Sequence, residues 1–425
     1  MAKTLAIDGG RPVCSEPWPQ WPWFPEKAIQ DAADCLRSGK VNYWTGTRGM
    51  EFEEKFADWC GTRFAVSTSS GTSALHVALA GLDIGPGDEV ICTPYAFIAS
   101  SFCVCQAGAI PVFVDVERKT HCMDPKAIEA AITPRTKAII PVHLYGNVCN
   151  MTAIMRIARR HKLRVIEDCA QAHGATWRGK KVGTIGHVNA FSFCQSKTFT
   201  TGGEGGMVTT DDEDVAWACR SFRDHGYDVA ERLRLLELEA KLPYIHNRVG
   251  FNYRMTEVQS ILGIHHLARL DRWNLKRRRK FGTFLNAELG KLPEVLHVPP
   301  HDPPKVENGF WVYPLVLDID RVRCTVREFV AALGAEGIPC GPVFWPQSYK
   351  EKAYWNRRGF GRFNYPFGDP KARKAATDYR KVHCPNAAWL EERTLVLYTL
   401  QPVYSMKLLR LVVKAVKKCL AAYRK

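Results

Sequence analysis

The sequence predicts a large α/β domain with a mostly parallel sheet, followed by a smaller α+β domain. From about Arg63 to Thr210, short apolar runs alternate with segments of helical periodicity. Repeated strand–helix–strand units with apolar strands are typical of a parallel sheet that helices cover on both faces. Beyond about Asp271, an alternating strand and two amphipathic helices replace that pattern, which indicates a second unit.

The expected elements of the first unit follow in chain order. Strands are expected at residues 64–68, 89–94, 110–116, 137–144, 163–170, 189–193 and 206–210. Helices are expected between them, at residues 73–82, 127–132 and 151–161, with a short one after residue 94. The uncharged stretch 90–114 contains Pro94 and Pro111 and divides into strand, helix and strand, so we interpret it as a buried layer and not as a membrane span.

The second unit contains fewer elements. A half-exposed strand is expected at residues 310–319, and amphipathic helices are expected at residues 326–338 and 408–423. Residues 344–384 are rich in aromatic, basic and glycine residues and form a segment that is long for a loop, so it is either functional or poorly ordered. We therefore expect an N-terminal arm (1–50), a large domain (51–270) and a small C-terminal domain (271–425).

Bulk composition limits the classes of protein that fit. The chain has 425 residues, 15 cysteines without a CxxC pair, and a formal net charge of +16. This cysteine usage favours a reducing cytoplasm and no metal site, and the N-terminus has no signal-peptide core. The basic run at residues 275–280, LKRRRK, is interpreted as the solvated continuation of a helix, with a polyanion site as the alternative. No nucleic-acid-binding signature accompanies it, so neither nucleic acid nor membrane is expected as a partner.

Two of the expected strands end in polar residues that suit a ligand. After residues 64–68 comes SSGTSAL, in which Gly71 lets the backbone approach closely and a helix N-terminus could bind phosphate. Ser69 or Ser70 could instead be a simple helix cap. Asp168 ends an apolar strand, where a carboxylate is costly without a partner such as a cationic ring nitrogen, although a salt bridge or cap would also serve. Gln171 lies three residues further on and could donate to the same ligand.

A third strand end offers an amine. Lys197 follows the strand at 189–193 and precedes several glycines, a setting that suits a desolvated amine attacking an aldehyde, though a surface lysine is the alternative. Phosphate, ring nitrogen and aldehyde together describe pyridoxal 5′-phosphate, for which a lysine and an aspartate are the expected protein groups. Phe97 would stack on the ring; Tyr95 competes for that role, and Phe97 could also be a core residue.

Four motifs carry a resemblance to a known family. They are SSGTSALHVALAGLDIGPGDEVICTPYAFIAS, VIEDCAQAHGATWRGKKVGTIG, FSFCQSKTFTTGGEGGMVTTDD and GFNYRMTEVQSILG. The chain resembles the DegT/DnrJ/EryC1/StrS sugar aminotransferase family from about residue 20 to about residue 320, and more loosely to its end. The resemblance implies a type I aminotransferase fold with a mostly parallel seven-stranded sheet, and a homodimer with active sites at the subunit interface.

The resemblance also implies a role for individual residues. Lys197 would bind the cofactor covalently, Asp168 would pair with its ring nitrogen, and Gln171 would contact its ring hydroxyl side. Phe97 would stack on the ring, and Asn252 would reach the phosphate bound by the partner subunit, unless it is only a turn or cap residue. The phosphate would be held by Gly71, Thr72 and Ser192.

The function implied is a ping-pong amino transfer from glutamate or glutamine to a keto sugar or keto cyclitol. Some relatives carry histidine in place of the lysine and are dehydratases, so Lys197 favours transamination. The stretch WPQWPWF and the opening GGRP resemble the branch that includes scyllo-inosose (aminocyclitol) and aminohydroxybenzoate-type enzymes. A dehydratase or lyase on the same fold, or a non-catalytic regulator, is the alternative, and the choice between free cyclitol and nucleotide-linked sugar stays open.

Overall fold

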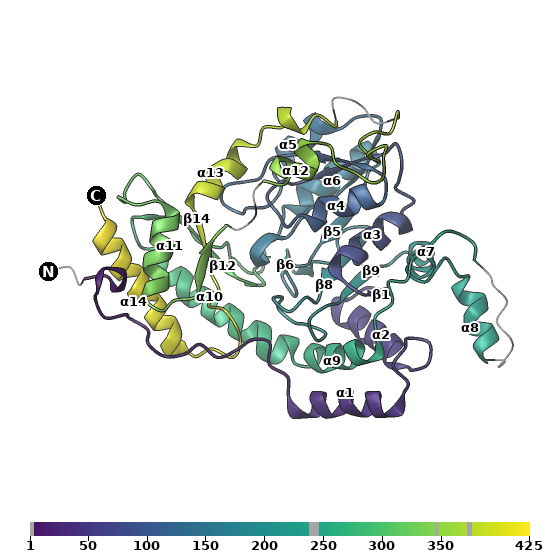
Figure 1. Ribbon diagram of the computed structural model, residues 1–425, viewed down its shortest axis with the longest axis horizontal. Helices are drawn as coiled ribbons and strands as arrows, with labels where there is room; N and C mark the ends of the chain where they lie inside the picture. Colours follow the sequence, from purple (N-terminus) through teal and green to yellow (C-terminus); the bar gives the residue numbers. More distant parts are fainter. Residues whose placement is uncertain (1–3, 238–245, 344, 346, 372–375) are drawn as a thin grey trace.

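The computed structural model describes residues 4–237, 246–343, 345, 347–371 and 376–425. Its centre is a seven-stranded sheet with the order β1-β9-β8-β5-β4-β2-β3 (Figure 1). The strands are β1 (Phe64–Thr68), β2 (Glu89–Cys92), β3 (Ile110–Phe113), β4 (Thr136–Ile139), β5 (Arg164–Asp168), β8 (Val188–Ser192) and β9 (Gly206–Thr210). Strands β8, β5, β4, β2 and β3 pair in parallel, whereas β9 pairs antiparallel with β8 and with β1. The expected mostly parallel sheet is confirmed.

Helices with clear sequence signals surround this sheet. Helix α3 (Gly71–Gly81) begins with a capping box between Ser70 and Ser73, is buried along most of its length, and packs against β8 and β9. The other helices of this part are α2 (Arg48–Cys60), α4 (Ala99–Gln106), α5 (Pro125–Ala131), α6 (Met151–His161), α7 (Glu213–Arg223), α8 (Val229–Glu237) and α9 (Glu257–Leu267). The stretch 90–114 forms β2, α4 and β3, as the sequence predicted. Within the described residues, no helix is both long and apolar enough to cross a lipid bilayer.

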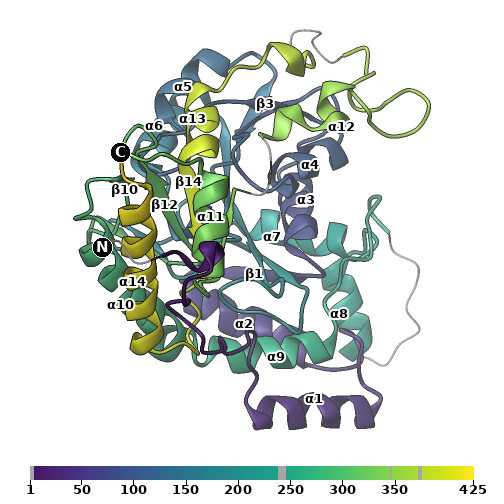
Figure 2. The same cartoon turned by 60° about the vertical axis from the view of Figure 1, so that its left-hand side comes forward.

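A second, antiparallel sheet has the order β10-β12-β14-β13. Its strands are β10 (Val295–His297), β12 (Tyr313–Leu317), β13 (Cys340–Pro342) and β14 (Thr394–Leu397). Helices α10 (Lys276–Leu289), α11 (Val326–Ala335) and α14 (Met406–Tyr423) lie outside it (Figure 2). The expectation of a half-exposed strand here was wrong, because all five residues of β12 are buried. Tyr313, Leu315 and Leu317 face the core under these helices, whereas Val316 faces the core of the large sheet.

The N-terminal segment runs along both parts of the molecule. Its short helix η1 (Ala6–Asp8) is held by Glu336, whose carboxylate accepts hydrogen bonds from the backbone amides of Ala6 and Val13. Helix α1 (Glu26–Ser38) then lies on the outside against α9 (Figure 1). The division into an arm, a large domain and a small domain with boundaries at residues 50 and 270 stays a prediction.

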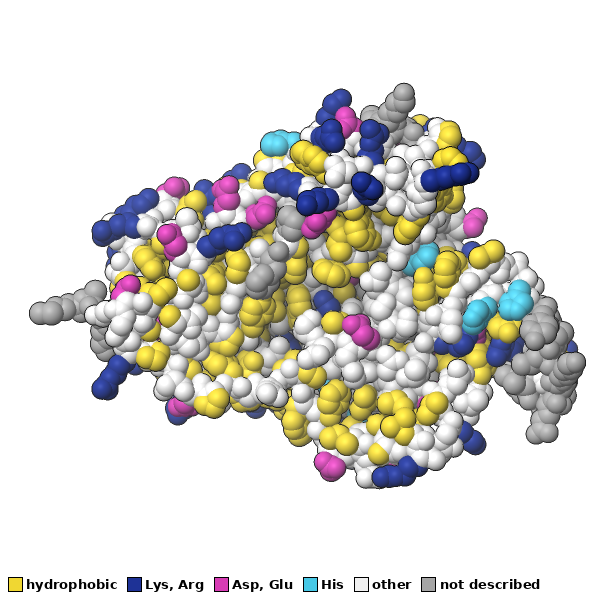
Figure 3. Space-filling model, in the orientation of Figure 1, with side chains coloured by type: hydrophobic (Ala, Val, Ile, Leu, Met, Phe, Trp, Pro, Cys, Tyr) yellow, Lys and Arg dark blue, Asp and Glu magenta, His cyan; other side chains and the backbone are white. Residues whose placement is uncertain are grey.

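The aromatic and basic segment 344–384 is partly described. It contains η4 (Ser348–Lys350), α12 (Lys352–Trp355) and η5 (Tyr379–Lys381) and leads into α13 (Pro385–Arg393). Three of its tyrosines, Tyr349, Tyr354 and Tyr379, are buried in the core of the large sheet. Basic side chains gather along the edge of the molecule at the top of Figure 3. The described part of this segment is therefore anchored by its aromatic residues.

The remaining elements are short. A three-stranded sheet joins β6 (Thr176–Trp177), β7 (Lys180–Lys181) and β11 (Val306–Glu307). A turn of 3-10 helix, η2 (Leu144–Gly146), follows β4, and one turn of π-helix, η3 (Leu270–Leu275), joins α9 to α10. Because η3 continues directly into α10, the basic run 275–280 lies at the start of that helix.

Candidate active site

Strand register brings the ends of β5, β8 and β1 together, with the start of β9 between β8 and β1. Asp168 at the end of β5 pairs with Ala190 of β8, and Ser192 at the end of β8 pairs with Gly206 of β9. Gly206 also pairs with Thr68, the last residue of β1, immediately before the turn into α3. The carboxyl ends of parallel strands are where ligands of such sheets bind. The three strand ends singled out in the sequence therefore lie at one edge of the sheet.

Asp168 is buried and held in place by two hydrogen bonds. Its side chain is 4% exposed. Oδ1 accepts a hydrogen bond from the backbone amide of Ala170 at 3.0 Å, and Oδ2 accepts one from the Ser100 hydroxyl at 2.7 Å. Sequence reasoning missed Ser100, although it lies one helical turn after Phe97. A buried carboxylate with only neutral donors on it is suited to a cationic partner supplied by a ligand.

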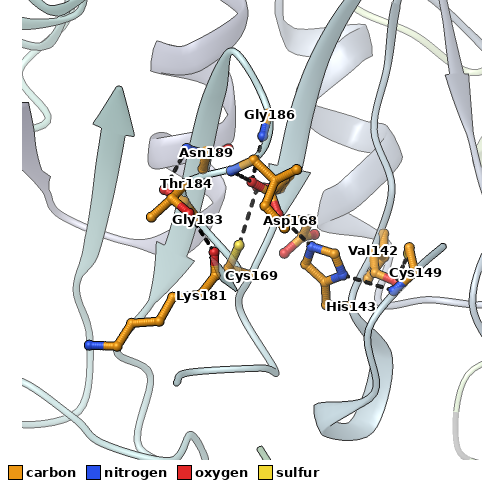
Figure 4. A network of polar contacts seen from close by, with 12 residues as sticks. Val142, His143, Cys149, Asp168, Cys169, Lys181, Gly183, Thr184, Gly186 and Asn189 are labelled. Atoms are coloured by element: carbon orange, nitrogen blue, oxygen red, sulfur yellow. Dashed lines mark hydrogen bonds and ion pairs between the residues drawn. The ribbon is translucent and has the colours of Figure 1, made fainter. Parts of the chain in front are cut away.

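A polar network surrounds Glu167, the residue before Asp168 at the end of β5 (Figure 4). It is joined to Asp168 by the backbone amide of His143, which donates to the Asp168 carbonyl at 3.0 Å. The His143 ring accepts a hydrogen bond from the Cys149 amide at Nδ1, which leaves Nε2 to donate to Glu167 at 2.9 Å. The other oxygen of Glu167 accepts from the amides of Ile185 and Gly186 at 2.8 and 2.7 Å. His143, Glu167 and Cys169 are close enough for a metal, but these hydrogen bonds already satisfy the carboxylate. The network therefore acts as a rigid support.

Lys197 presents an amine to this edge. Its side chain keeps partial exposure, yet protein atoms surround the amine closely, and this desolvation lowers the pKa of Lys197 below its usual value. The charges of Asp168, Cys194 and Glu204 oppose that shift. Among the described residues, no carboxylate forms an ion pair with Lys197. A lysine amine of lowered pKa is the form that attacks an aldehyde.

The turn from β1 into α3 forms a narrow cradle. The Ser70 hydroxyl accepts from the amide of Ser73, while the first amides of the helix, of Gly71 and Thr72, have no partner within a helix. A Cβ atom added at Gly71 would lie 2.5 Å from Cβ of Ser192, so only glycine fits there. A helix N-terminus next to a serine is suited to a phosphate group.

Phe97 and Tyr95 differ in what they can reach. Phe97 is 53% exposed and lies edge-on to Trp345, with ring centroids 6.5 Å apart. Its carbonyl accepts a hydrogen bond from the amide of Ser100, which places it near Asp168. Tyr95 is 1% exposed and packs between His121 and Tyr145. Only Phe97 therefore has a free face for a flat ligand.

The other predicted residues have varied positions. Gln171 is buried, and its Oε1 accepts a hydrogen bond from the amide of Tyr145 at 2.9 Å. Asn252 is exposed and forms a backbone bridge with Asp224, and the carbonyl of the next residue, Tyr253, accepts a hydrogen bond from the amide of Ser69 at 2.7 Å. Arg254, two residues further on, forms an ion pair with Asp224. The strand register places Asp168, Ser192 and the turn before Gly71 at adjoining strand ends, and the charge of Asp168 acts on the Lys197 amine. The roles of Gln171, Phe97 and Asn252 stay predictions.

The residues present fit pyridoxal 5′-phosphate. A buried carboxylate, an amine of lowered pKa, an exposed aromatic ring and a helix N-terminus match its ring nitrogen, aldehyde, ring face and phosphate. Only glycine fits at residue 71, because a Cβ atom there would meet Ser192, and this close approach sets the first turn of α3 beside the Ser192 hydroxyl, as a phosphate site requires.

Comparison with known proteins agrees with this fit. The chain is 44% identical over 297 residues to GDP-perosamine synthase of Caulobacter vibrioides, which covers 70% of this chain and 76% of that protein. It is 37% identical over 358 residues to L-glutamine:2-deoxy-scyllo-inosose aminotransferase of Streptoalloteichus tenebrarius, covering 80% of this chain and 81% of that protein.

Solved structures extend the likeness to the fold. The aminotransferase from Psychrobacter cryohalolentis superposes with a TM-score of 0.84 at 34% identity, covering 96% of this chain and all of that one. NtdA from Bacillus subtilis, solved with bound PMP, has a TM-score of 0.77 at 26% identity and covers 96% of this chain and 86% of that one. The expected type I aminotransferase fold is confirmed. A sequence model of the DegT/DnrJ/EryC1/StrS aminotransferase family matches residues 24–367. The chain therefore belongs to the DegT/DnrJ/EryC1/StrS aminotransferase family and is a pyridoxal 5′-phosphate-dependent enzyme.

Proposed function

We propose that the protein moves an amino group from glutamine or glutamate to the ketone of a keto sugar or keto cyclitol. The observation that carries the proposal is the amine of Lys197, desolvated and within electrostatic reach of the buried Asp168 at the end of the parallel strands. Histidine at this position would favour a dehydratase, but the chain has lysine. A dehydratase or lyase reaction is therefore the weaker alternative.

In this proposal each side chain has a defined task. Pyridoxal 5′-phosphate, when bound, supplies a ring that accepts the electrons of a substrate C–H bond. Lys197 would bind the cofactor covalently through its amine and, when free, would carry the proton taken from the donor's α-carbon. Asp168 would keep the ring nitrogen protonated, and Phe97 would stack on the ring. Gln171 would contact the ring hydroxyl, and Gly71, Thr72 and Ser192 would hold the phosphate.

The chemistry of the substrates is taken from the relatives. The name of the Streptoalloteichus protein gives L-glutamine as donor and a cyclitol ketone as acceptor. The name of the Caulobacter protein gives a nucleotide-linked amino sugar as product. One name gives a ketone on a polyhydroxylated ring as the acceptor and the other gives an amino sugar as the product, so we assign a ketone on a polyhydroxylated ring as the substrate class. All fifteen cysteines are free thiols, which supports a reducing, cytoplasmic location.

A homodimer with shared active sites is part of the proposal. Val249 is 83% exposed and Phe251 is 43% exposed, and they lie just before Asn252. Large apolar side chains exposed together favour contact with another protein surface. A second copy that covers them would bring Asn252 to the phosphate site of its partner, as expected from the sequence.

The covalent step can be tested directly. The holoenzyme is treated with borohydride, digested and analysed by mass spectrometry, and the reduced cofactor is expected on Lys197. Lys197→Ala should lose the adduct and the half-reaction, whereas Lys181→Ala, which changes another partly buried lysine next to an indole ring, should retain both. An adduct that persists in Lys197→Ala contradicts the assignment.

The acceptor is tested with the amino form of the enzyme. It is prepared with glutamine and mixed in parallel with scyllo-inosose and with a nucleotide-linked 4-keto sugar, and the return of the aldehyde form is followed by absorbance. Transfer to either ketone supports the proposal, and the faster one names the acceptor class. Loss of water from the sugar without gain of nitrogen favours the dehydratase alternative.

A further inference from the structure

Trp311 contacts both the amine and the backbone of the lysine segment. It lies just before β12 and is 8% exposed. The amine of Lys197 lies over its ring, 4.3 Å from the ring centroid. Its indole Nε1 donates a hydrogen bond to the carbonyl of Ser196 at 2.6 Å. The side chain of Trp311 therefore contacts both the Lys197 amine and the backbone carbonyl of the preceding residue.

The backbone around Lys197, here called the lysine loop (residues 194–200), is held by other distant segments as well. Nε1 of Trp21 donates to the carbonyl of Lys197 at 3.2 Å. The side-chain Nδ2 of Asn274 donates to the carbonyl of Thr198, and its Oδ1 accepts a hydrogen bond from Nε of Arg278 at 2.7 Å. Arg278 also donates to the carbonyl of Trp311 at 2.9 Å. The backbone of Trp311 is thus tied through Arg278 and Asn274 to the same loop that its indole contacts.

Several charged or titratable groups face the Lys197 amine. Asp168, Glu204 and Cys194 favour its charged form. His173 is fully buried, and its pKa, lowered by burial and by the neighbouring Lys197 and Arg278, keeps the imidazole neutral. None of the described acidic groups forms an ion pair with the amine. When the amine accepts a proton, the new charge lies over the indole ring of Trp311, 4.3 Å from the ring centroid.

We propose that Trp311 is a positioning residue for Lys197, whose ring face binds the protonated amine and whose indole N–H fixes the lysine loop. The inference rests on the proposed function, in which the displaced amine takes up a proton from the donor and must return it. A cation over an indole face is stabilised without a formal negative charge. The ammonium therefore stays in place between the two proton transfers instead of turning towards a carboxylate.

The ring contact is tested on the cofactor-free protein. The rate of acetylation of Lys197 is measured against pH by mass spectrometry, and its midpoint reports how strongly the site favours the ammonium. In Trp311→Met the midpoint should fall by about half to one pH unit, because the ring face is lost. Trp311→Phe should produce a smaller fall, since phenylalanine is a weaker platform, and Trp21→Phe should produce none. Lys181, whose amine lies over Trp59 at 4.4 Å, is the internal control in every digest.

A midpoint in Trp311→Met equal to that of the wild type overturns the ring contact. If that variant is insoluble, Trp311→Phe decides through its direction: a midpoint at or above the wild-type value overturns it. The labelling uses no cofactor or substrate. An unchanged midpoint therefore contradicts the ring contact without affecting the assignment of the covalent adduct to Lys197. A missing adduct contradicts the proposed function and not the ring contact.

The backbone contact is tested by hydrogen exchange in a variant that keeps a ring. Trp311→Phe removes the N–H donor to Ser196, so amides of the lysine loop should exchange about tenfold faster than in the wild type. Trp177→Phe, which removes an indole donor to Thr152 far from this loop, is the control. Unchanged exchange in the lysine loop of Trp311→Phe overturns this part of the inference.

Discussion

Replacing Ser100 by alanine tests whether the hydrogen bond to Asp168 serves catalysis. The Ser100 hydroxyl donates to Oδ2 at 2.7 Å, and both residues are buried. The neighbouring Ser101 provides a matched control, because it is equally buried on the same helix but donates to the carbonyl of Ile98 at 3.2 Å. The two substitutions remove the same atom one residue apart, and only the first one touches the carboxylate.

The size of the effect follows from the kind of bond that is lost. A hydrogen bond to a charged group contributes about 1.5–3 kcal/mol. If this free energy holds Asp168 against the ring nitrogen, its loss slows amino transfer by about 10- to 100-fold. Ser101→Ala loses a neutral bond worth about 1 kcal/mol of stability and should leave the rate within about twofold. Both variants lose some stability, so the rate distinguishes them.

The assay is the single-turnover half-reaction. Each holoenzyme is mixed with saturating glutamine, and conversion of the cofactor to its amino form is followed by stopped-flow absorbance, with Lys197→Ala as the inactive reference. Thermal unfolding of each variant confirms that it is folded. If Ser100→Ala and Ser101→Ala react at the same rate, Ser100 does not act through Asp168, and the role assigned to its hydrogen bond is refuted.

Three further predictions concern stability and assembly. Arg278→Lys should lower the free energy of unfolding by about 2–4 kcal/mol, because the buried guanidinium donates to four acceptors. Lys276→Ala, at an exposed position of the same helix, should change it by less than about 0.5 kcal/mol. Equal urea unfolding midpoints for the two variants would contradict this prediction. Burial lowers the pKa of His121 to about 3. Below pH 6.5 this imidazole therefore binds a proton in the unfolded chain but stays neutral in the folded protein. Stability is therefore lost as pH falls, and His121→Phe should recover about 1.4 kcal/mol of the decrease between pH 7.5 and 5.5 in urea titrations; an unchanged pH slope would reject the burial argument. Val249→Glu should convert a dimer into a monomer by light scattering, whereas Trp355→Glu should not, and a dimer that survives Val249→Glu would place the interface elsewhere.

Local sequence signals were enough to find the strand ends and their chemistry. The apolar run before Asp168, the Ser and Gly residues that open α3, and the glycines after Lys197 are all short-range patterns. In a parallel sheet such strand ends lie at one edge by geometry, so the convergence of these residues followed from the fold class. The positions of Asp168, Lys197 and Gly71 were for this reason predictable, while their catalytic roles stay proposals.

Errors arose where burial depends on a distant segment. Arg278 belongs to a basic run that the sequence indicated as solvated, yet it is fully buried and bonded to Gln401 and to the carbonyls before β12. Helical periodicity shows which face a residue lies on, but not that a second sheet covers that face. The strand β12 was misjudged for the same reason, since its supposed exposed side packs against the core of the large sheet.

The sequence by itself determined the elements, the parallel sheet and the amine, carboxylate and glycine turn at its edge, because these depend on periodicity and on residue types a few positions apart. Only the tertiary structure decided that Ser100 holds Asp168 and that Trp311, 114 positions after Lys197 in the chain, lies under its amine. Contacts between segments so far apart leave no periodic trace in the sequence, and packing of the two cores alone sets them.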